Sequence, residues 1–157
     1  MRKTIISEQP VPKADPELAY INVEQLAQVQ VSSENADYPI EAALLDVMAS
    51  GWLAADAGSQ TIRLIFDEPI TIKQIFLEIE ELQQSRTQEF VLSWLKTGEA
   101  TMREILRQQF CFSPPTTTKQ SEQYALNLEQ LLELELIIIP DISQGHAYAK
   151  LKTLRLG

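Results

Sequence analysis

The sequence predicts an all-β fold, a β-sandwich with one or two short helices, and three observations lead to this prediction. Apolar residues alternate with polar ones along many short segments, which is the period of a half-buried strand. Loops rich in serine, threonine, asparagine, glycine and proline separate these segments. The length of 157 residues, with 45% hydrophobic and 22% charged residues, suits one globular domain with a core of ordinary size.

The chain is expected to begin with an extended or partly disordered arm over residues 1–20. Pro10, Pro12 and Pro16 interrupt a polar stretch that has no periodicity. We therefore assign residues 21–157 to the β-sandwich domain as a single unit.

Two short helices and one strand are predicted next. The side chain of Asn22 can accept a hydrogen bond from the first amides of a helical turn that ends near Leu26. Residues 28–33 alternate as a strand, and a polar loop follows. Pro39 precedes a run of helix formers and predicts about two turns of helix over residues 40–46.

The clearest strand pattern lies within residues 51–80, which are expected to form one loop and two strands. Ile62, Leu64 and Phe66 share one face of the first strand. Pro69 has no amide hydrogen to give to a ladder, so it should separate the first strand from the second.

The second of these strands contains a break in its alternation. Ile70 and Ile72 share one face, whereas Ile75 and the apolar residues after it follow the next register. A bulge at Lys73 and Gln74 would cause such a slip and would bend the strand.

The remaining alternation predicts strands over residues 86–95, 102–112, 123–128, 133–139 and 147–156. A hairpin turn at 96–99 joins the first two of them. Helix formers compete within 102–112, but Phe110 and Phe112 favour the strand. Residues 127–132 are expected to turn helically, and the last strand slips in phase between Leu151 and Leu154.

The charge of the chain argues against two classes of partner. A formal net charge of -9 and a pI near 4.6 disfavour nucleic acid and anionic membrane, since both require lysine and arginine to replace counterions. We interpret the two local groups of bases as scattered solubilising residues: Arg103, Arg107 and Lys119, and then Lys150, Lys152 and Arg155.

The sequence predicts a cytoplasmic protein in a reducing compartment. Cys111 is the single cysteine, which excludes an internal disulfide, and we expect it to be a small buried apolar residue. The basic start lacks a sustained apolar run, so no signal peptide is predicted. The longest apolar run, residues 136–139, is too short to span a bilayer.

Taken in order, several segments resemble the discoidin or coagulation-factor C-type (F5/8 type C) domains of the galactose-binding-like superfamily. The matching segments are Ser32-Ser33, Ala43-Leu44-Leu45-Asp46, Trp52, residues 60–66, residues 72–79 and residues 149–157. Within the superfamily the pattern is most similar to the amino-terminal domain of the eukaryotic single-strand-break repair scaffold protein. The resemblance implies a jelly-roll of eight strands whose end loops bind sugars, lipids, proteins or damaged DNA.

The resemblance also implies a place for calcium near the loop after the second helix, which maps onto Asp46 and Ser50. The carboxylate that the family supplies from its last strand is missing, because Thr153 and Arg155 stand there. An arginine would repel the ion, so we favour an ordinary aspartate at a helix end and expect no cofactor.

A sugar site requires an aromatic face and polar groups for the hydroxyls. The loop candidates are Tyr38, Trp52, His146 and Tyr148. We interpret Trp52 as a packed anchor at the core or its rim, and His146 as a plain loop residue.

Nothing in the sequence predicts catalysis. Nucleophile elbows, phosphate loops and metalloprotease motifs are absent, and Cys111 with His146 makes no dyad by any spacing rule. The carboxylates of Glu78, Glu80 and Glu81 are interpreted as a solvated strand end.

The sequence therefore predicts a non-catalytic recognition module and favours carbohydrate as its ligand, because of the resemblance and the loop tyrosines. An intracellular protein-interaction or assembly domain stays open, since the calcium carboxylate is missing. Binding to nicked or gapped DNA is a third and weaker hypothesis, because the net charge opposes it.

Overall fold

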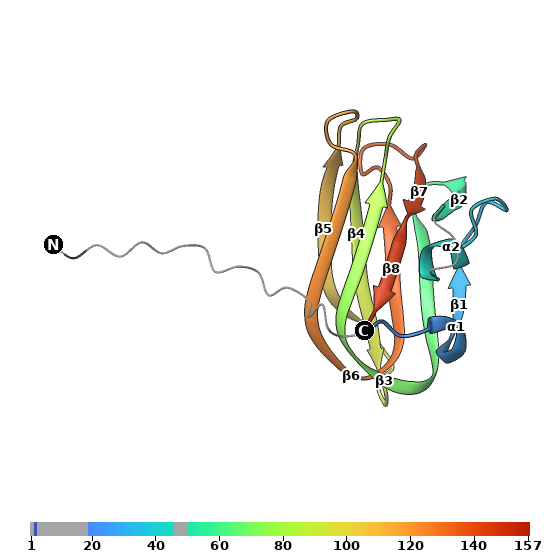
Figure 1. Ribbon diagram of the computed structural model, residues 1–157, viewed down its shortest axis with the longest axis vertical. Coiled ribbons are helices and arrows are strands. Elements are labelled where there is room, and N and C mark those ends of the chain that lie inside the picture. The colour runs from blue at the N-terminus through green and yellow to red at the C-terminus, as the bar shows by residue number, and fades with distance from the viewer. Residues whose placement is uncertain (1, 3–18, 46–49) are drawn as a thin grey trace.

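The computed structural model describes residues 2, 19–45 and 50–157, and within them two short helices and eight strands form a β-sandwich (Figure 1). The helices are α1 (Val23–Leu26) and α2 (Glu41–Leu44). The strands are β1 (Ala27–Val31), β2 (Trp52–Ala57), β3 (Gln60–Glu80), β4 (Arg86–Lys96), β5 (Arg103–Phe112), β6 (Lys119–Ile139), β7 (Tyr148–Leu151) and β8 (Thr153–Leu156). The predicted all-β sandwich with short helices is confirmed. The predicted arm, residues 1–20, lies almost wholly outside the described residues.

The two longest strands, β3 and β6, belong to both layers of the sandwich. Each contains 21 residues, and Figure 1 shows both running down one layer, bending, and returning in the other. The first half of β3 lies between β1 and the second half of β6, which also pairs with β4, and β5 follows β4 at the edge. The second half of β3 lies between β8 and the first half of β6.

The bend explains two predictions that were wrong. Pro69 does not separate two strands, because β3 continues through it and merely lacks regular pairing with β6 between Ile65 and Ile70. The expected helical turn at 127–132 is also part of a strand, and there Gln130 takes a φ of 58°. The carbonyl of Gln130 accepts a hydrogen bond of 2.9 Å from the amide of Thr97, which holds the bend against the β4–β5 hairpin.

The predicted bulge in β3 is confirmed. Gln74 and Ile75 are consecutive and both buried, and the register with β6 shifts between Ile72 and Gln74. The phase slip in the last predicted strand is confirmed as well. There the chain leaves β7, which pairs with β2, and enters β8, which pairs with β3.

The expected loop after Gly51 is wrong in part, because it contains strand β2. β2 and β7 form a separate two-stranded sheet beside the main one. Gly51 must be glycine for this pairing to start, since its φ is +74° and a Cβ would lie 2.8 Å from the carbonyl oxygen of Leu151.

One apolar cluster fills the space between the layers. Ile62 and Leu64 are each 1% exposed and belong to this cluster, to which β2 to β8 contribute buried residues and against which β1 packs partly buried ones. Burial of this kind is the main stabilising contribution to a domain of this size. The strand predicted at 102–112 is confirmed as β5, whose Phe112 enters the cluster.

Three smaller predictions can be compared directly with the structure. Asn22 caps α1 as expected, and its side chain accepts from the amide of Glu24 at 3.1 Å. α2 contains four residues and is shorter than the two turns predicted over residues 40–46, and residues 46–49 lie outside the described residues. The expected burial of Cys111 is wrong: the residue is exposed, because Phe110 and Phe112 take the inward face of β5 and the period of two turns Cys111 outward.

Among the described residues, none belongs to a helix that is both long and apolar enough to cross a membrane.

Candidate functional site

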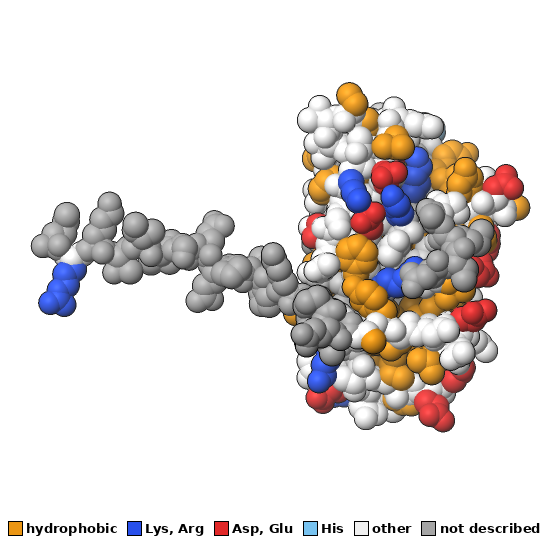
Figure 2. Space-filling model, viewed as in Figure 1, with side chains coloured by type: hydrophobic (Ala, Val, Ile, Leu, Met, Phe, Trp, Pro, Cys, Tyr) orange, Lys and Arg blue, Asp and Glu red, His pale blue; other side chains and the backbone are white. Residues whose placement is uncertain are grey.

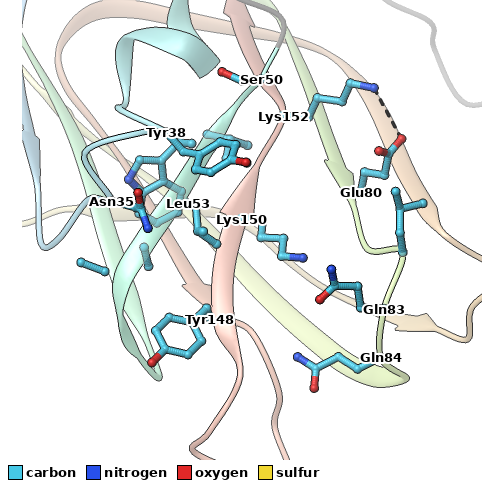
Figure 3. A pocket seen from close by; sticks show the side chains of 15 residues that line it. Asn35, Tyr38, Ser50, Leu53, Glu80, Gln83, Gln84, Tyr148, Lys150 and Lys152 are labelled. Carbon is cyan, nitrogen blue, oxygen red and sulfur yellow. Dashed lines mark hydrogen bonds and ion pairs between the residues drawn. The ribbon is translucent and has the colours of Figure 1, made fainter.

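A pocket of about 730 Å³ lies between the small β2–β7 sheet and the loop at 81–85 that follows β3. Figure 3 shows tyrosine rings on one side of the pocket and glutamine side chains on the other. Lys150 of β7 lies between these sides, and its ammonium group points toward Gln83. The pocket therefore combines flat apolar surfaces with hydrogen-bonding groups.

Two tyrosines form the aromatic side. Tyr148 is the first residue of β7. Its neighbours in the sequence, Ala147 and Ala149, are buried, so the ring of Tyr148 faces outward and is 45% exposed. Tyr38 is 41% exposed and is held by the backbone, because its carbonyl accepts from the amide of Leu53 at 3.2 Å. Both rings have accessible faces at fixed positions, which suits the stacking of a flat or cyclic ligand.

Trp52 supports this side from beneath. It is 2% exposed, and its indole Nε1 donates to the carbonyl of Ser33 at 3.1 Å. The hydroxyl of Ser33 accepts from the amide of Ala55 at 3.1 Å and donates to Gln60 at 2.8 Å. These bonds fasten β2 to the preceding loop, and the interpretation of Trp52 as a packed anchor agrees with its burial.

The loop at 81–85 forms the opposite side. Gln83 and Gln84 present amide groups to the pocket, and the side chain of Leu82 is 63% exposed at its rim. Amide side chains can both donate and accept, so they match hydroxyl groups of either orientation.

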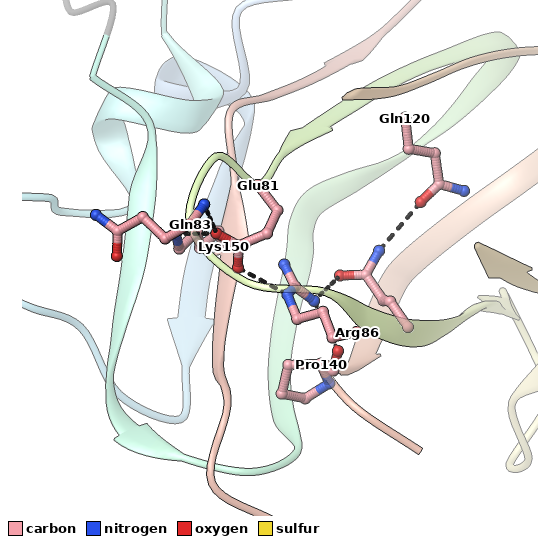
Figure 4. Close-up of polar contacts among 7 residues, drawn as sticks. Glu81, Gln83, Arg86, Gln120, Pro140 and Lys150 are labelled. Carbon is pink, nitrogen blue, oxygen red and sulfur yellow. Dashed lines mark hydrogen bonds and ion pairs between the residues drawn. The ribbon is translucent and has the colours of Figure 1, made fainter. Parts of the chain in front are cut away.

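A buried ion pair fixes this loop at both ends (Figure 4). Arg86 donates from Nε to Glu81 at 2.8 Å, and both side chains have zero exposure. Glu81 also accepts from the Gln83 amide at 3.1 Å and from Lys150 at 3.0 Å. Arg86 donates from Nη1 to the carbonyl of Pro140 at 2.7 Å, so the network ties the loop to β7 and to the end of β6.

The network controls the charge state of Glu81. Burial by itself would raise the pKa of the Glu81 carboxyl, but hydrogen bonds from Arg86, Lys150 and the Gln83 amide outweigh burial and hold the pKa below its ordinary value. Glu81 is thus an anion in the interior. The interpretation of Glu81 as part of a solvated strand end is wrong, because it lies beyond β3 and turns into the protein rather than along the edge.

The structure brings together most of the predicted site residues. Tyr38, Ser50, Trp52 and Tyr148 all line the pocket. His146 is exposed and lies outside the lining residues, and Asp46 falls outside the described residues.

Sequence reasoning missed the polar residues of the pocket. Gln83 and Gln84 had no periodic or motif signal, because they stand in a loop whose position depends on the buried pair beneath it. Lys150 was interpreted as a solubilising base, yet alternation along β7 already placed it on a different face from Ala149.

The arginine of the last strand contacts the helix that precedes the implied calcium position, whose Asp46 lies outside the described residues. Arg155 donates from Nη1 to the carbonyl of Ala43 in α2 at 2.9 Å. Within residues 2, 19–45 and 50–157, no group of three or more histidine, cysteine or acidic side chains is arranged to hold a metal ion.

The bases considered for nucleic acid form ion pairs with glutamates. Arg103 pairs with Glu99, and Arg107 pairs with Glu89 at 3.0 Å. Lys119 lies 3.2 Å from Glu78. These pairs agree with the interpretation of the bases as scattered surface charges.

No family model matches the chain, and no curated protein matches it. Solved structures do match. A family 32 carbohydrate-binding module of Clostridium perfringens NanJ, in complex with galactose, has a TM-score of 0.59 and 12% identity over 87% of this chain and 96% of that one. Reduced XRCC1 bound to the DNA polymerase beta catalytic domain has a TM-score of 0.56 and 15% identity over 88% and 98%.

A Ruminococcus gnavus GH29 fucosidase in complex with fucose has a TM-score of 0.62 and 10% identity over 87% of this chain. The match spans 26% of the fucosidase chain, about a quarter of its length. Identities this low establish the fold alone. These matches confirm the predicted β-sandwich fold, which this chain shares with the F5/8 type C domain and with XRCC1 at the level of the fold.

Proposed function

We propose that this galactose-binding-like sandwich is a non-catalytic module that binds carbohydrate in the pocket between β2, β7 and the loop at 81–85. The observation that carries the proposal is the pairing of two exposed tyrosines with amide side chains across one pocket. A sugar ring has apolar C–H faces and a rim of hydroxyls. The pocket offers a partner for each.

The hydrogen bonds and the buried ion pair that hold the lining residues in place favour a preformed site. Tyr38 and Tyr148 stand on backbone that is hydrogen-bonded into the β2–β7 sheet, and the glutamine side rests on the buried Glu81–Arg86 pair. A site that is fixed before binding loses less conformational freedom on binding. Solved carbohydrate-binding modules of the same fold add support for this class of ligand.

A glycan array tests the proposal first, followed by titration calorimetry with the glycan that gives the strongest signal. Tyr148→Ala removes the most exposed ring of the pocket and is expected to weaken binding by about tenfold to a hundredfold, because a stacked aromatic contributes roughly 1–3 kcal/mol.

The chain offers a matched control. Tyr20 is also 45% exposed but does not line the pocket, so Tyr20→Ala should leave the affinity unchanged. An array without signal at high protein concentration, or equal losses in both variants, would contradict the proposal.

A second candidate is a protein-interaction domain. Leu82, at 63% exposure, stands with Tyr38 and Tyr148 around one pocket, and such an apolar rim can anchor a protein partner. The structure of XRCC1 bound to a polymerase domain is an example of this fold in contact with a protein. A cytoplasmic location, which the sequence predicts, would favour this candidate.

Affinity capture separates the two candidates. A partner that binds the wild type and is lost with Leu82→Ser, while the array remains silent, would favour the protein-interaction domain. Capture without any reproducible partner would count against it.

A further inference from the structure

The pocket contains a charge that a neutral sugar would not need. We propose that the site prefers acidic glycans and that Lys150 is the residue that determines this specificity by pairing with a ligand carboxylate. This inference rests on the proposed carbohydrate function. It adds the chemical class of the sugar, which would be a uronic acid or a sialic acid.

Lys150 is positioned to reach a ligand in the pocket. It lies between the tyrosine side and the glutamine side of the pocket, and its side chain is 31% exposed (Figure 3). An ammonium group has three N–H donors, and one of them is directed at Glu81 at 3.0 Å. Two donors therefore remain for a bound ligand.

The buried pair of Glu81 and Arg86 lies behind Lys150. Glu81 does not neutralise Lys150 on its own, because the same carboxylate also accepts from Arg86 at 2.8 Å. The side chains of Glu81 and Arg86 are both fully buried, so their opposite charges cancel within the protein. The group of three then has one positive charge in excess, and Lys150 is its accessible member.

Further lysines and glutamates near the pocket pair with one another. Lys152 lies 3.4 Å from Glu80 and 3.7 Å from Glu78, and Lys119 lies 3.2 Å from Glu78. Two lysines and two glutamates thus balance one another. Figure 2 shows basic and acidic side chains interspersed with apolar ones over the upper part of this face.

Among the lining residues, Lys150 and Lys152 against Glu80 leave one positive charge in excess, in a chain whose formal net charge is -9. At physiological salt the screening length is about 8 Å, so distant carboxylates contribute little to the potential inside the pocket. A single accessible cation beside aromatic faces suits a sugar with one carboxylate per ring, because the charge-assisted hydrogen bond is about twice as strong as a neutral one.

The test uses matched pairs of ligands that differ in charge. One arm compares oligogalacturonate with its methyl ester, and the second compares sialyllactose with lactose, which separates the two sources of a carboxylate. By titration calorimetry we expect the acid of at least one pair to bind about tenfold more tightly than its neutral counterpart, which corresponds to 1.4 kcal/mol. Raising the salt concentration should weaken the binding of the acidic ligand and leave the affinity for the neutral ligand unchanged.

Three variants test whether Lys150 determines the preference for the acid. Lys150→Gln should abolish the preference for the acid, whereas Lys150→Arg should keep it. Lys73→Gln removes one positive charge from an exposed residue in the β3 bulge, away from the pocket, and should also keep it. A thermal melt of each variant shows that it is folded.

The outcomes distinguish this inference from the proposed function. Equal binding of acid and neutral ligands, with loss of both in Tyr148→Ala, would overturn the acidic preference and leave the carbohydrate function standing. Acid preference that survives in Lys150→Gln would overturn the role of Lys150. Absence of binding to both acids overturns the inference, and silence on the whole array overturns the carbohydrate function as well.

Discussion

Replacing Glu81 by glutamine should destabilise the domain far more than an exposed charge replacement does. The change keeps the shape of the side chain but removes the negative charge between Arg86 and Lys150, both within 3.0 Å. Arg86 would remain fully buried without a compensating anion, and breaking a buried pair in this way costs roughly 3–5 kcal/mol. A domain of this length loses about 2–4 °C of melting temperature per kcal/mol, so the melting temperature should fall by on the order of 10 °C.

Urea unfolding followed by circular dichroism measures the free energy directly. Glu104→Gln is the matched control, because Glu104 forms a half-exposed pair with Arg107, and such pairs contribute about 0–1 kcal/mol. The combined replacement of Glu81 and Arg86 by leucine and methionine should cost less than Glu81→Gln alone, since no buried charge is left unpaired. A Glu81→Gln variant within 1 kcal/mol of wild type would refute the buried pair as the support of the loop.

Three further predictions concern pH, the core and the thiol. Because the folded-state pKa of Glu81 lies below its ordinary value, its contribution to stability is complete above the unfolded pKa of about 4.5 and is lost as the pH falls through the folded pKa, so acid should destabilise the wild type more steeply than Glu81→Gln. Leu64→Asp should leave the chain unfolded by circular dichroism, because the site is 1% exposed and an unpaired buried charge costs several kcal/mol; a soluble variant with a cooperative melt would contradict this. Cys111 should react with a thiol reagent in the native protein within the time that a denatured sample needs, and protection until unfolding would show that the thiol is not exposed.

The parts of the fold that the sequence predicted well are those set by alternation. Ile62, Leu64 and Phe66 lie on the buried face of β3 as expected, and the slip at Gln74 shows as two consecutive buried residues. The period of two reports which side chains face the core, and burial of those side chains determines the strand.

The errors arose where a distant segment decides the local conformation. Pro69 was expected to end a strand, but it lies in the bend, where β3 and β6 have no regular pairing for a missing amide to disrupt. The segment at 127–132 has a helical composition, but Leu128 and Leu131 pair with β3, and this long-range pairing keeps the segment within strand β6 although Gln130 is left-handed. Neither cause is visible in a short window of sequence.

Only part of the candidate site was predicted, because the positions of its other residues also depend on segments that are distant in the sequence. The loop aromatics Tyr38 and Tyr148 could be found from residue type alone, and the fold places them around one pocket. Gln83 and Lys150 become site residues through Glu81, whose buried pairing with Arg86 requires the three-dimensional structure to recognise. The residues around Glu81 in the sequence gave no indication that its carboxylate would turn into the protein.

We assign glycan binding to the pocket formed by Tyr38, Tyr148 and the 81–85 loop. Mapping by amide chemical-shift changes, during titration with the strongest glycan of the array, tests it most directly. We predict that the largest changes fall on Tyr148, Lys150 and the 81–85 loop, while Tyr20 and the β4–β5 hairpin stay unchanged. Changes concentrated at any other part of the sandwich, or none at saturating glycan, would contradict this assignment.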